Sequence, residues 1–250
     1  EGRLDLDAPV SRYIGSAIDW PTAKSAITTR MLLNHTSGLP STSPCLDQTS
    51  TMTLKACAGE IAAQPLDFTP GGRFGYSGTG YQVAGLVAEQ ITGQSWSALF
   101  RERVTNPLGM NSFSYGEQTN PRIAGGAASN AADYLRFSQA ILDDGAPLLS
   151  VEQGQMLKQN QVSGLAVFYS PELPAAQLDG YSFGWWISAT GNHPGSTGPE
   201  ISDPGAFGSV PWVDFGERYT AVLLISGTPD QGLAIWSAAR SAILATLGTN

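Results

Sequence analysis

The sequence is poor in residues that bind metals, with two cysteines and two histidines among 250 residues. The histidines, His35 and His193, lie far apart, and neither has a cysteine beside it. Structural and catalytic zinc sites need three or four Cys, His or acidic ligands at close spacing. We therefore expect no metal site and no organic cofactor.

Long apolar runs and clustered basic residues are also lacking. No run reaches the roughly 18 apolar residues that a membrane span needs. There are 13 Lys and Arg against 21 Asp and Glu, which gives a net charge of −8. Nucleic-acid binding requires clustered positive charge. We therefore expect neither a membrane span nor a nucleic-acid partner, and the length and 42% hydrophobic content suit one large domain or two small ones.

The two cysteines, Cys45 and Cys57, lie in one Ser/Thr/Pro-rich segment that leads into a short helix. Two cysteines on one local loop, with none left over, favour a disulfide formed in an oxidising compartment. We therefore expect a secreted or periplasmic protein. The alternative is a pair of free thiols in a cytosolic protein.

Apolar periodicity divides the chain into two regions, 1–165 and 166–250. The first is expected to be mostly helical, and its helices are predicted near residues 54–63, 79–92, 95–104, 130–145 and 147–160. The second contains three runs rich in aromatic or β-branched residues and then a helix: 181–188, 206–214, 219–226 and 231–247. The fold class is thus α/β (α+β), an antiparallel sheet flanked by helices plus an inserted helical region. One helix covers one face of a three-stranded sheet, so we expect further cover from polypeptide outside this chain.

The most distinctive segment is residues 70–81, with the sequence PGGRFGYSGTGY. Five glycines and one proline surround the pair Tyr76-Ser77, and a helical pattern follows directly. Such a loop fixes the backbone in shapes where other residues would clash. The pattern predicts a tyrosine held on a rigid turn, with its hydroxyl able to face a cleft.

Seven segments, in order along the chain, resemble the serine β-lactamase and penicillin-binding-protein family, in the branch with class C β-lactamases, esterases and D-aminopeptidases. These segments are residues 2–10, 27–40, 70–80, 106–110, 125–129, 181–185 and 203–214. They are distributed along most of the chain, from residue 2 to residue 214. The resemblance implies a β-lactamase/transpeptidase-like fold and acyl transfer through a serine, acting on a small-molecule or short-peptide substrate.

The family uses a Ser-x-x-Lys pair, a Tyr-x-Asn loop and a Lys/His-x-Gly strand. The tyrosine motif aligns with Tyr76-Ser77-Gly78, so the resemblance implies Tyr76 as general acid/base, with Ser77 and Gly78 at the substrate. Gly78 replaces the family's asparagine, so a substrate-orienting amide is lost.

The strand motif aligns with Asp203-Pro204-Gly205, which implies Asp203 and Gly205 at the substrate and the Ala206 N–H as an oxyanion donor. Asp203 replaces a cation and would repel a carboxylate. This favours neutral esters or amides, or substrates with a free amine, over penicillins and D-Ala-D-Ala peptides. Two other interpretations stay open: Asp203 as a solvated turn residue, and His193-Pro194-Gly195 as the motif.

No Ser-x-x-Lys occurs in the sequence. The residues three positions before Lys24, Lys55 and Lys158 are Pro21, Met52 and Gln155. In the family this motif precedes the segment that matches residues 2–10. We therefore expect the nucleophile upstream of Glu1, on a separate N-terminal chain of the same precursor or on a missing segment.

The sequence thus predicts an exported, monomeric serine hydrolase. A catalytically degenerate binding protein of the same fold is one alternative, and a true β-lactamase or D-Ala-D-Ala carboxypeptidase is another. A triad of Ser77, His193 and Asp203 is disfavoured, because no Gly-x-Ser-x-Gly turn is present. His35 is expected to be a structural, hydrogen-bonded histidine.

Overall fold

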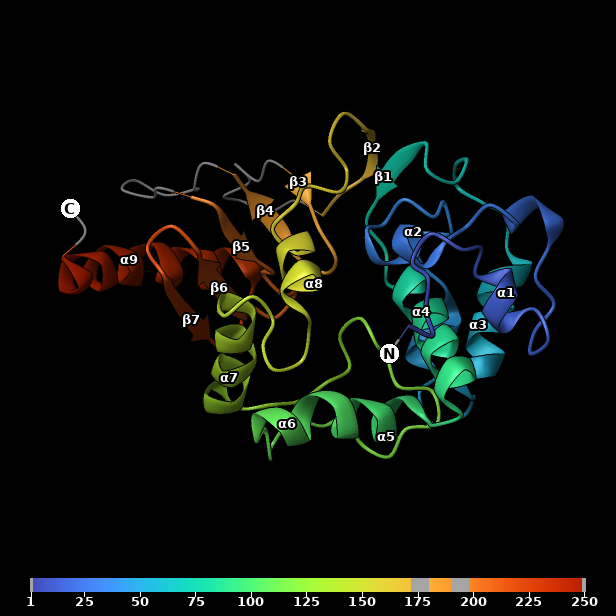
Figure 1. Ribbon diagram of the computed structural model, residues 1–250, viewed down its shortest axis with the longest axis horizontal. Coiled ribbons are helices and arrows are strands. Elements are labelled where there is room, and N and C mark those ends of the chain that lie inside the picture. The colour runs from blue at the N-terminus through green and yellow to red at the C-terminus, as the bar shows by residue number, and fades with distance from the viewer. Residues whose placement is uncertain (1, 172–179, 190–197, 249–250) are drawn as a thin grey trace. The chain divides into compact units, whose positions relative to one another are not determined.

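The computed structural model describes residues 2–171, 180–189 and 198–248 (Figure 1). The chain forms two compact units. The first comprises Glu1–Arg103, Ser114–Ala128 and Gly164–Pro171, and the second comprises Val104–Phe113, Ser129–Ser163 and Glu172–Asn250. The units are interleaved along the chain, whereas the composition divides it once, near residue 165.

The first unit is built from short helices around the longer helix α4. Its elements are α1 (Ser11–Ile14), η1 (Thr22–Lys24), α2 (Thr29–Leu33), η2 (Pro44–Asp47), α3 (Leu54–Ala63), α4 (Gly78–Thr92), α5 (Trp96–Phe100) and the strands β1 (Arg73–Gly75) and β2 (Ala166–Tyr169). The expected helices at 54–63 and 79–92 are confirmed. Gly93 ends α4 in the left-handed conformation, φ +71°, a backbone shape that glycine adopts without strain.

The core of the first unit lies between α4 and the elements around it. Val83, Leu86 and Val87 of α4 are buried among apolar residues of the N-terminal segments, such as Ile14 and Leu32. A disulfide joins Cys45 of η2 to Cys57 of α3, with the two Cα atoms 5.2 Å apart. The disulfide expected from cysteine spacing is therefore confirmed, and it ties the loop to this core.

The second unit contains a five-stranded antiparallel sheet in the order β3-β4-β5-β6-β7. The strands are β3 (Gly180–Tyr181), β4 (Trp186–Ser188), β5 (Glu200–Ser202), β6 (Val210–Asp214) and β7 (Tyr219–Leu223); the helices are α6 (Asn106–Leu108), α7 (Ala131–Leu142), α8 (Val151–Met156) and α9 (Pro229–Leu247). A π-helical turn, Arg101–Thr105, runs from α5 into α6.

Helices cover both faces of this sheet (Figure 1). Alternation along β6 turns Val213 toward α7, in a cluster with Ile201 of β5 and Ile141 of α7. It turns Trp212 toward α9, where its ring lies 5.2 Å from that of Trp236. Part of the cover for the second face comes from this chain, because α7, which the composition had grouped with the helical region, packs on β6 and β7. Further cover from polypeptide outside this chain stays a prediction.

The strands also differ in detail from those expected. The run 181–188 splits into β3 and β4, because a turn closed by the Ser182 N–H and the Trp185 carbonyl oxygen (2.8 Å) interrupts it. Residues 206–209, expected to begin a strand, belong to the loop 203–209 between β5 and β6. The strands β2 and β5 were not predicted, since three or four residues are too few to establish a period.

Candidate active site

Tyr76 and Ser77 form the whole connection between β1 and α4. On one side, the Tyr76 N–H donates to the Tyr169 carbonyl oxygen of β2 at 3.0 Å. On the other, Ser77 is the N-cap residue of α4, with an extended backbone. A two-residue link between a paired strand and a long helix leaves Tyr76 little backbone freedom.

The segment 35–40 binds this connection from the other side. The Gly75 N–H donates to the His35 carbonyl oxygen at 2.9 Å, and the Ser77 N–H donates to His35 Nδ1 at 3.2 Å. The Gly71 N–H donates to the Thr36 carbonyl oxygen at 2.8 Å. The glycine-rich loop is thus fastened along its length to residues that follow α2.

The Ser77 hydroxyl is part of a buried hydrogen-bonded chain. Thr79 Oγ1 donates its only proton to the Pro40 carbonyl oxygen at 2.7 Å. The Ser77 hydroxyl, 2.7 Å from Thr79 Oγ1, must therefore be the donor in their shared hydrogen bond. With Ser77 only 7% exposed, this hydroxyl has a structural partner, and contact between Ser77 and substrate stays a prediction.

The Tyr76 side chain is half-buried and packs on the His35 ring. The two ring centroids lie 4.4 Å apart, with the planes tilted by 43°. Tyr81 also packs on His35, at 5.2 Å, but its hydroxyl donates to the Leu33 carbonyl oxygen at 2.9 Å. Two tyrosines therefore share one histidine, and Tyr81 anchors α4 to α2.

His35 itself is buried, and burial lowers its pKa to about 3. The imidazole is therefore neutral at neutral pH. The expectation of a structural, hydrogen-bonded histidine agrees with its bond to the Ser77 N–H.

Gly78, where the family has asparagine, is the first residue of α4. A Cβ at this position would lie 3.4 Å from Ala124 Cβ and 3.5 Å from Leu46 Cδ1, which is ordinary contact. The backbone here would accept a side chain, so the missing amide is not forced by crowding at Cβ.

In the second unit, residues 203–209 form a turn closed on itself. The Gly205 N–H donates to the Ser209 carbonyl oxygen at 2.8 Å, and the Gly208 N–H donates to the Gly205 carbonyl oxygen at 3.0 Å. Ala206 is exposed, and among the described residues its N–H has no hydrogen-bond partner. This amide can donate to a ligand, although it lies on a loop and not on the strand expected.

Asp203 follows β5 directly and is half-buried. Burial raises the pKa of its carboxyl to about 7, because the charged form loses solvation. Near neutral pH the group is therefore only partly ionised, which weakens the repulsion of anions expected from an aspartate. His193, in the alternative motif and in the disfavoured triad, lies outside the described residues.

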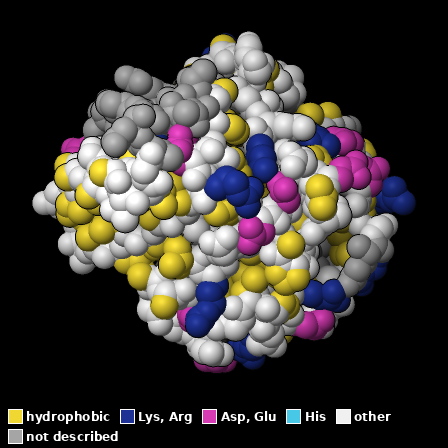
Figure 2. Space-filling model, turned by 60° about the vertical axis from the view of Figure 1, so that its left-hand side comes forward, with side chains coloured by type: hydrophobic (Ala, Val, Ile, Leu, Met, Phe, Trp, Pro, Cys, Tyr) yellow, Lys and Arg dark blue, Asp and Glu magenta, His cyan; other side chains and the backbone are white. Residues whose placement is uncertain are grey.

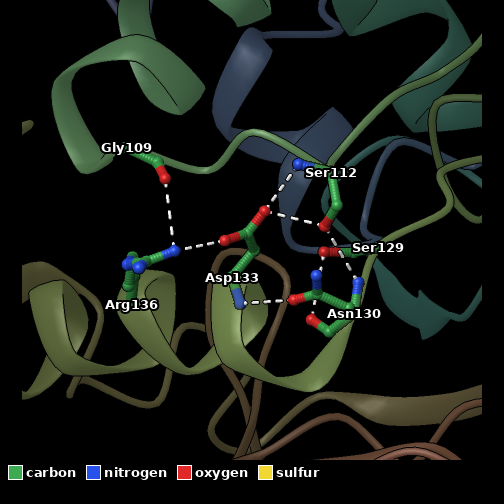
Figure 3. Close-up of polar contacts among 6 residues, drawn as sticks. All are labelled: Gly109, Ser112, Ser129, Asn130, Asp133 and Arg136. Atoms are coloured by element: carbon green, nitrogen blue, oxygen red, sulfur yellow. Dashed lines mark hydrogen bonds and ion pairs between the residues drawn. The ribbon is translucent and has the colours of Figure 1, made fainter.

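A serine–aspartate pair that the sequence did not reveal lies at the N-terminus of α7 (Figure 3). Asp133 accepts from the Ser112 N–H at 2.6 Å and from the Ser112 hydroxyl at 2.7 Å, and it also pairs with Arg136. The hydrogen bonds from Ser112, with Arg136, lower the pKa of Asp133. Such a carboxylate is a weak base, so we interpret the pair as an anchor for the segment before α7, with Asn130 as N-cap.

The face of the described residues in Figure 2 shows no large basic patch. On the face in Figure 2, lysine and arginine side chains lie singly or in small groups next to acidic ones. Within the described ranges, no helix combines the length and hydropathy that a membrane crossing requires. Nor do those residues bring three Cys, His, Asp or Glu side chains together as metal ligands.

Comparison with known proteins gives consistent matches. A family model described as Beta-lactamase matches residues 1–243. Penicillin-binding protein 4 of Amycolatopsis lactamdurans is 28% identical over 241 aligned positions, and the match covers 80% of this chain and 62% of that protein. The chain thus spans about three-fifths of the length of this curated relative.

Two solved structures extend the likeness to the fold. A penicillin-binding protein homologue from Pyrococcus abyssi matches with a TM-score of 0.78 at 19% identity, covering 100% of this chain and 61% of that chain. A D-stereospecific amidohydrolase from Streptomyces sp. matches with a TM-score of 0.70 at 23% identity, covering 94% and 79%. The β-lactamase/transpeptidase-like fold expected from the order of the seven segments is confirmed.

Proposed function

The chain belongs to the beta-lactamase family, and from this premise we propose that it is part of a serine hydrolase. The reaction is cleavage of an ester or an amide through an acyl-enzyme. The substrate is a small molecule or a short peptide. Tyr76 moves the proton, and the Ala206 N–H is one of two donors to the oxyanion.

The first half of the reaction forms the acyl-enzyme. A serine hydroxyl attacks the substrate carbonyl carbon, and its proton passes to the Tyr76 phenolate oxygen. The new C–O bond places a negative charge on the carbonyl oxygen, which accepts from the Ala206 N–H. When the tetrahedral species collapses, the bond to the leaving alkoxide or amine breaks, and that group takes the proton from Tyr76. In the second half, water attacks the acyl carbon and its proton passes to Tyr76. The ester bond to the serine then breaks, the serine oxygen takes the proton from Tyr76, and the acid is released.

We propose that the nucleophilic serine lies outside residues 1–250. No lysine of this chain has a serine three residues before it, and a hydroxyl needs a neighbouring base to become reactive. Ser77 is a poor substitute, because its hydroxyl is buried and donates to Thr79. We propose that the Ser-x-x-Lys pair is supplied by other polypeptide, on a separate chain or a contiguous segment of the same precursor.

The main support for this proposal is that hydrogen bonds fix the backbone on both sides of Tyr76. Its neighbours Gly75 and Ser77 are both hydrogen-bonded to His35, yet its own side chain is only half-buried. A packing tyrosine would not need a loop of this rigidity. A general acid/base must be placed within hydrogen-bond reach of the reacting atoms, and a fixed loop achieves this.

Two substitutions favour a second candidate, a binding protein of the same fold without catalysis. Gly78 stands where the family has asparagine, and Asp203 stands where it has a cation. In an active enzyme, the ionised fraction of Asp203 favours neutral or amine-bearing substrates over the anionic substrates of β-lactamases and D-Ala-D-Ala carboxypeptidases. The disulfide supports a secreted or periplasmic location.

The test compares Tyr76→Phe with Tyr81→Phe in the complete protein that carries this chain. Both variants lose one hydroxyl beside the His35 ring. We expect Tyr76→Phe to lower kcat/KM at least about a hundredfold, as for loss of a positioned acid/base. We expect Tyr81→Phe to affect stability only, because its hydroxyl bonds to a carbonyl. Wild-type turnover of Tyr76→Phe would refute the assignment.

Labelling locates the nucleophile. The complete protein is treated with a fluorophosphonate and digested, and the modified peptide is found by mass spectrometry. We expect the adduct on a serine outside residues 1–250. An adduct on Ser77 would show that the nucleophile lies within this chain, and a complete protein that is neither labelled nor active on esters and amides would support the binding protein.

A further inference from the structure

His35 lies directly behind the connection that carries Tyr76. It follows α2 and its C-cap residue Asn34, and it is only 3% exposed. Its ring contacts three aromatic rings, with centroid distances of 4.4 Å to Tyr76, 5.2 Å to Tyr81 and 5.9 Å to Phe74. The Tyr76 ring therefore packs against the imidazole of His35.

The hydrogen bonds of His35 reach the residues on both sides of Tyr76. Its carbonyl oxygen accepts from the Gly75 N–H at 2.9 Å, and its Nδ1 accepts from the Ser77 N–H at 3.2 Å. The same residue thus binds the chain before Tyr76 through its backbone and after Tyr76 through its side chain. His35 adopts a left-handed backbone, φ +59°, which is uncommon outside glycine. This conformation costs free energy, and it persists only because contacts with the surrounding residues offset that cost.

The bond to Ser77 also determines the protonation state of the ring. An imidazole nitrogen that accepts a hydrogen bond carries no proton, so the single proton of His35 is on Nε2. A charged imidazolium would point an N–H at the Ser77 N–H and break this contact. Burial lowers the pKa of His35 to about 3, which agrees with a neutral ring.

We propose that neutral His35, protonated on Nε2, is a positioning residue that holds the Tyr76 phenol at the reacting atoms by binding Gly75 and Ser77 and packing on the Tyr76 ring. The inference rests on the proposed function, because it assigns His35 a role only through Tyr76. His35 exchanges no proton with substrate. The link to β1 and α4 restricts the Tyr76 backbone, and His35 fixes the orientation of its side chain.

The test uses two substitutions of His35 in the complete protein. His35→Phe keeps an aromatic ring but leaves the Ser77 N–H without its acceptor. His35→Asn places an amide oxygen near the position of Nδ1, and asparagine tolerates the left-handed backbone. We expect His35→Phe to lower kcat about tenfold or more, with KM changed less than about threefold, and His35→Asn to recover most of this loss. Equal kcat for the two variants would overturn the inference.

A double variant separates positioning from general structural damage. If His35 acts through Tyr76, then adding His35→Phe to Tyr76→Phe should lower kcat no further. A histidine that only supports the fold would lower kcat by the same factor in both backgrounds, and that result would overturn the inference. If Tyr76→Phe alone keeps wild-type turnover, the proposed function fails first, and the two failures are thereby distinguished.

A measurement on the unsubstituted ring does not depend on how the variants fold. Nitrogen NMR of labelled protein, with the His35 signals identified by their loss in His35→Asn, reports the tautomer. We expect a neutral ring protonated on Nε2 from pH 8 to about pH 4, where a free histidine is largely charged. A His35 ring that becomes charged near pH 6.5, or that carries its proton on Nδ1, would contradict the inference.

Discussion

The two compact units hold their central polar groups in opposite ways. Around Tyr76 the buried groups are uncharged: the His35 ring, the Ser77 and Thr79 hydroxyls and backbone amides. In the second unit, Glu200, Asp214 and Arg240 are each at most 2% exposed. Arg240 Nη2 lies 3.0 Å from Asp214 Oδ2 and also pairs with Glu200. The surroundings of Tyr76 thus use neutral hydrogen bonds, and the core of the sheet uses two acids and one base.

This difference predicts how the stability of each unit changes when a hydrogen-bond or ion-pair partner is removed, or when the pH changes. A neutral hydrogen bond contributes about 1 kcal/mol net. A buried ion pair contributes little net stability, but removal of one member leaves an uncompensated charge. We therefore expect single charge changes to affect the stability of the sheet and α9 most. Changes of backbone geometry should matter more in the Tyr76 loop, residues 70–81, and in the segment 35–40 that binds it.

The largest effect is expected for Arg240→Met. It leaves Glu200 and Asp214 side by side in register without their cation, and such a change typically costs about 3–5 kcal/mol. Unfolding in urea measures the loss. The matched control is Arg136→Met, whose side chain is 52% exposed and which should cost under about 1 kcal/mol. Equal losses of unfolding free energy in Arg240→Met and Arg136→Met would contradict the expected difference between a buried and an exposed ion pair.

Glycine substitutions test the sensitivity to backbone geometry. Gly38 has φ +72°, and an added Cβ would lie 2.1 Å from the Phe68 carbonyl oxygen. We expect Gly38→Ala to cost about 2–4 kcal/mol, through strain and the displaced backbone.

Gly205 of the Asp203 loop is the comparison, since its added Cβ would come no closer than 3.7 Å to Ser209. Gly205→Ala should change the free energy of unfolding by less than about 1 kcal/mol. A larger loss for Gly205→Ala than for Gly38→Ala would contradict the idea that the segment 35–40, which holds the Tyr76 connection, is more rigid than the Asp203 loop.

His35 and Asp214 should make opposite contributions to the pH dependence of stability. Burial, and after it the Glu200 carboxyl, raises the pKa of Asp214 above its ordinary value of 3.8. Its folded form then holds a proton that the unfolded chain loses, so this contribution to stability is complete below pH 3.8 and falls as pH rises. The lowered pKa of His35 acts the other way: its contribution is complete above the ordinary value of 6.5 and falls as pH drops toward 3.

Hydrogen exchange of amides in each unit, corrected for intrinsic rates, measures both slopes. The Ser77 amide reports on the first unit and the Glu217 amide, bound to Asp214 Oδ1 at 2.8 Å, on the second. Glu200→Gln should flatten the slope of the second unit only, and His35→Asn that of the first only. A slope that stays unchanged in either substituted protein would contradict the contribution assigned to that residue.

The smallest effect concerns Asp203. As pH rises through its pKa of about 7, the carboxylate forms and repels anionic substrates. We expect the preference for a neutral ester over its carboxylate-bearing analogue to rise roughly two- to tenfold between pH 6 and pH 8. In Asp203→Asn this rise should be absent, and Asp203→Lys should favour the anionic analogue. A preference that is the same in all three proteins would mean that Asp203 does not face the substrate.

Much of the fold could be predicted from local patterns. The apolar spacing of Val83, Leu86 and Val87 and the glycine at position 93 are sufficient for α4. The short strands were harder, because β5 and β2 are defined by their partners and not by a period of their own. α7 was predicted as a helix, but nothing in its sequence says that it packs on β6 and β7.

The candidate site divides in the same way. Tyr76 and the Asp203-Pro204-Gly205 segment could be found from motifs, because spacing and residue type are local properties. The buried ion pairs of the second unit could not be found in this way. They join Glu200, Asp214 and Arg240, which are 14 and 26 residues apart in the sequence (214 − 200 and 240 − 214). These residues meet only through strand register and the docking of α9. Buried charges have no local signature when their counterions lie on other elements.

The sequence by itself determined the order of the family motifs, the disulfide pair and a rigid loop around Tyr76, because these depend on residue type and close spacing. Only the tertiary structure decided that His35 binds both neighbours of Tyr76, that α7 covers the sheet, and that Arg240 joins two acids. Each of these requires segments distant in the chain to meet, and the free energy of that meeting comes from burial and hydrogen bonding in the folded core.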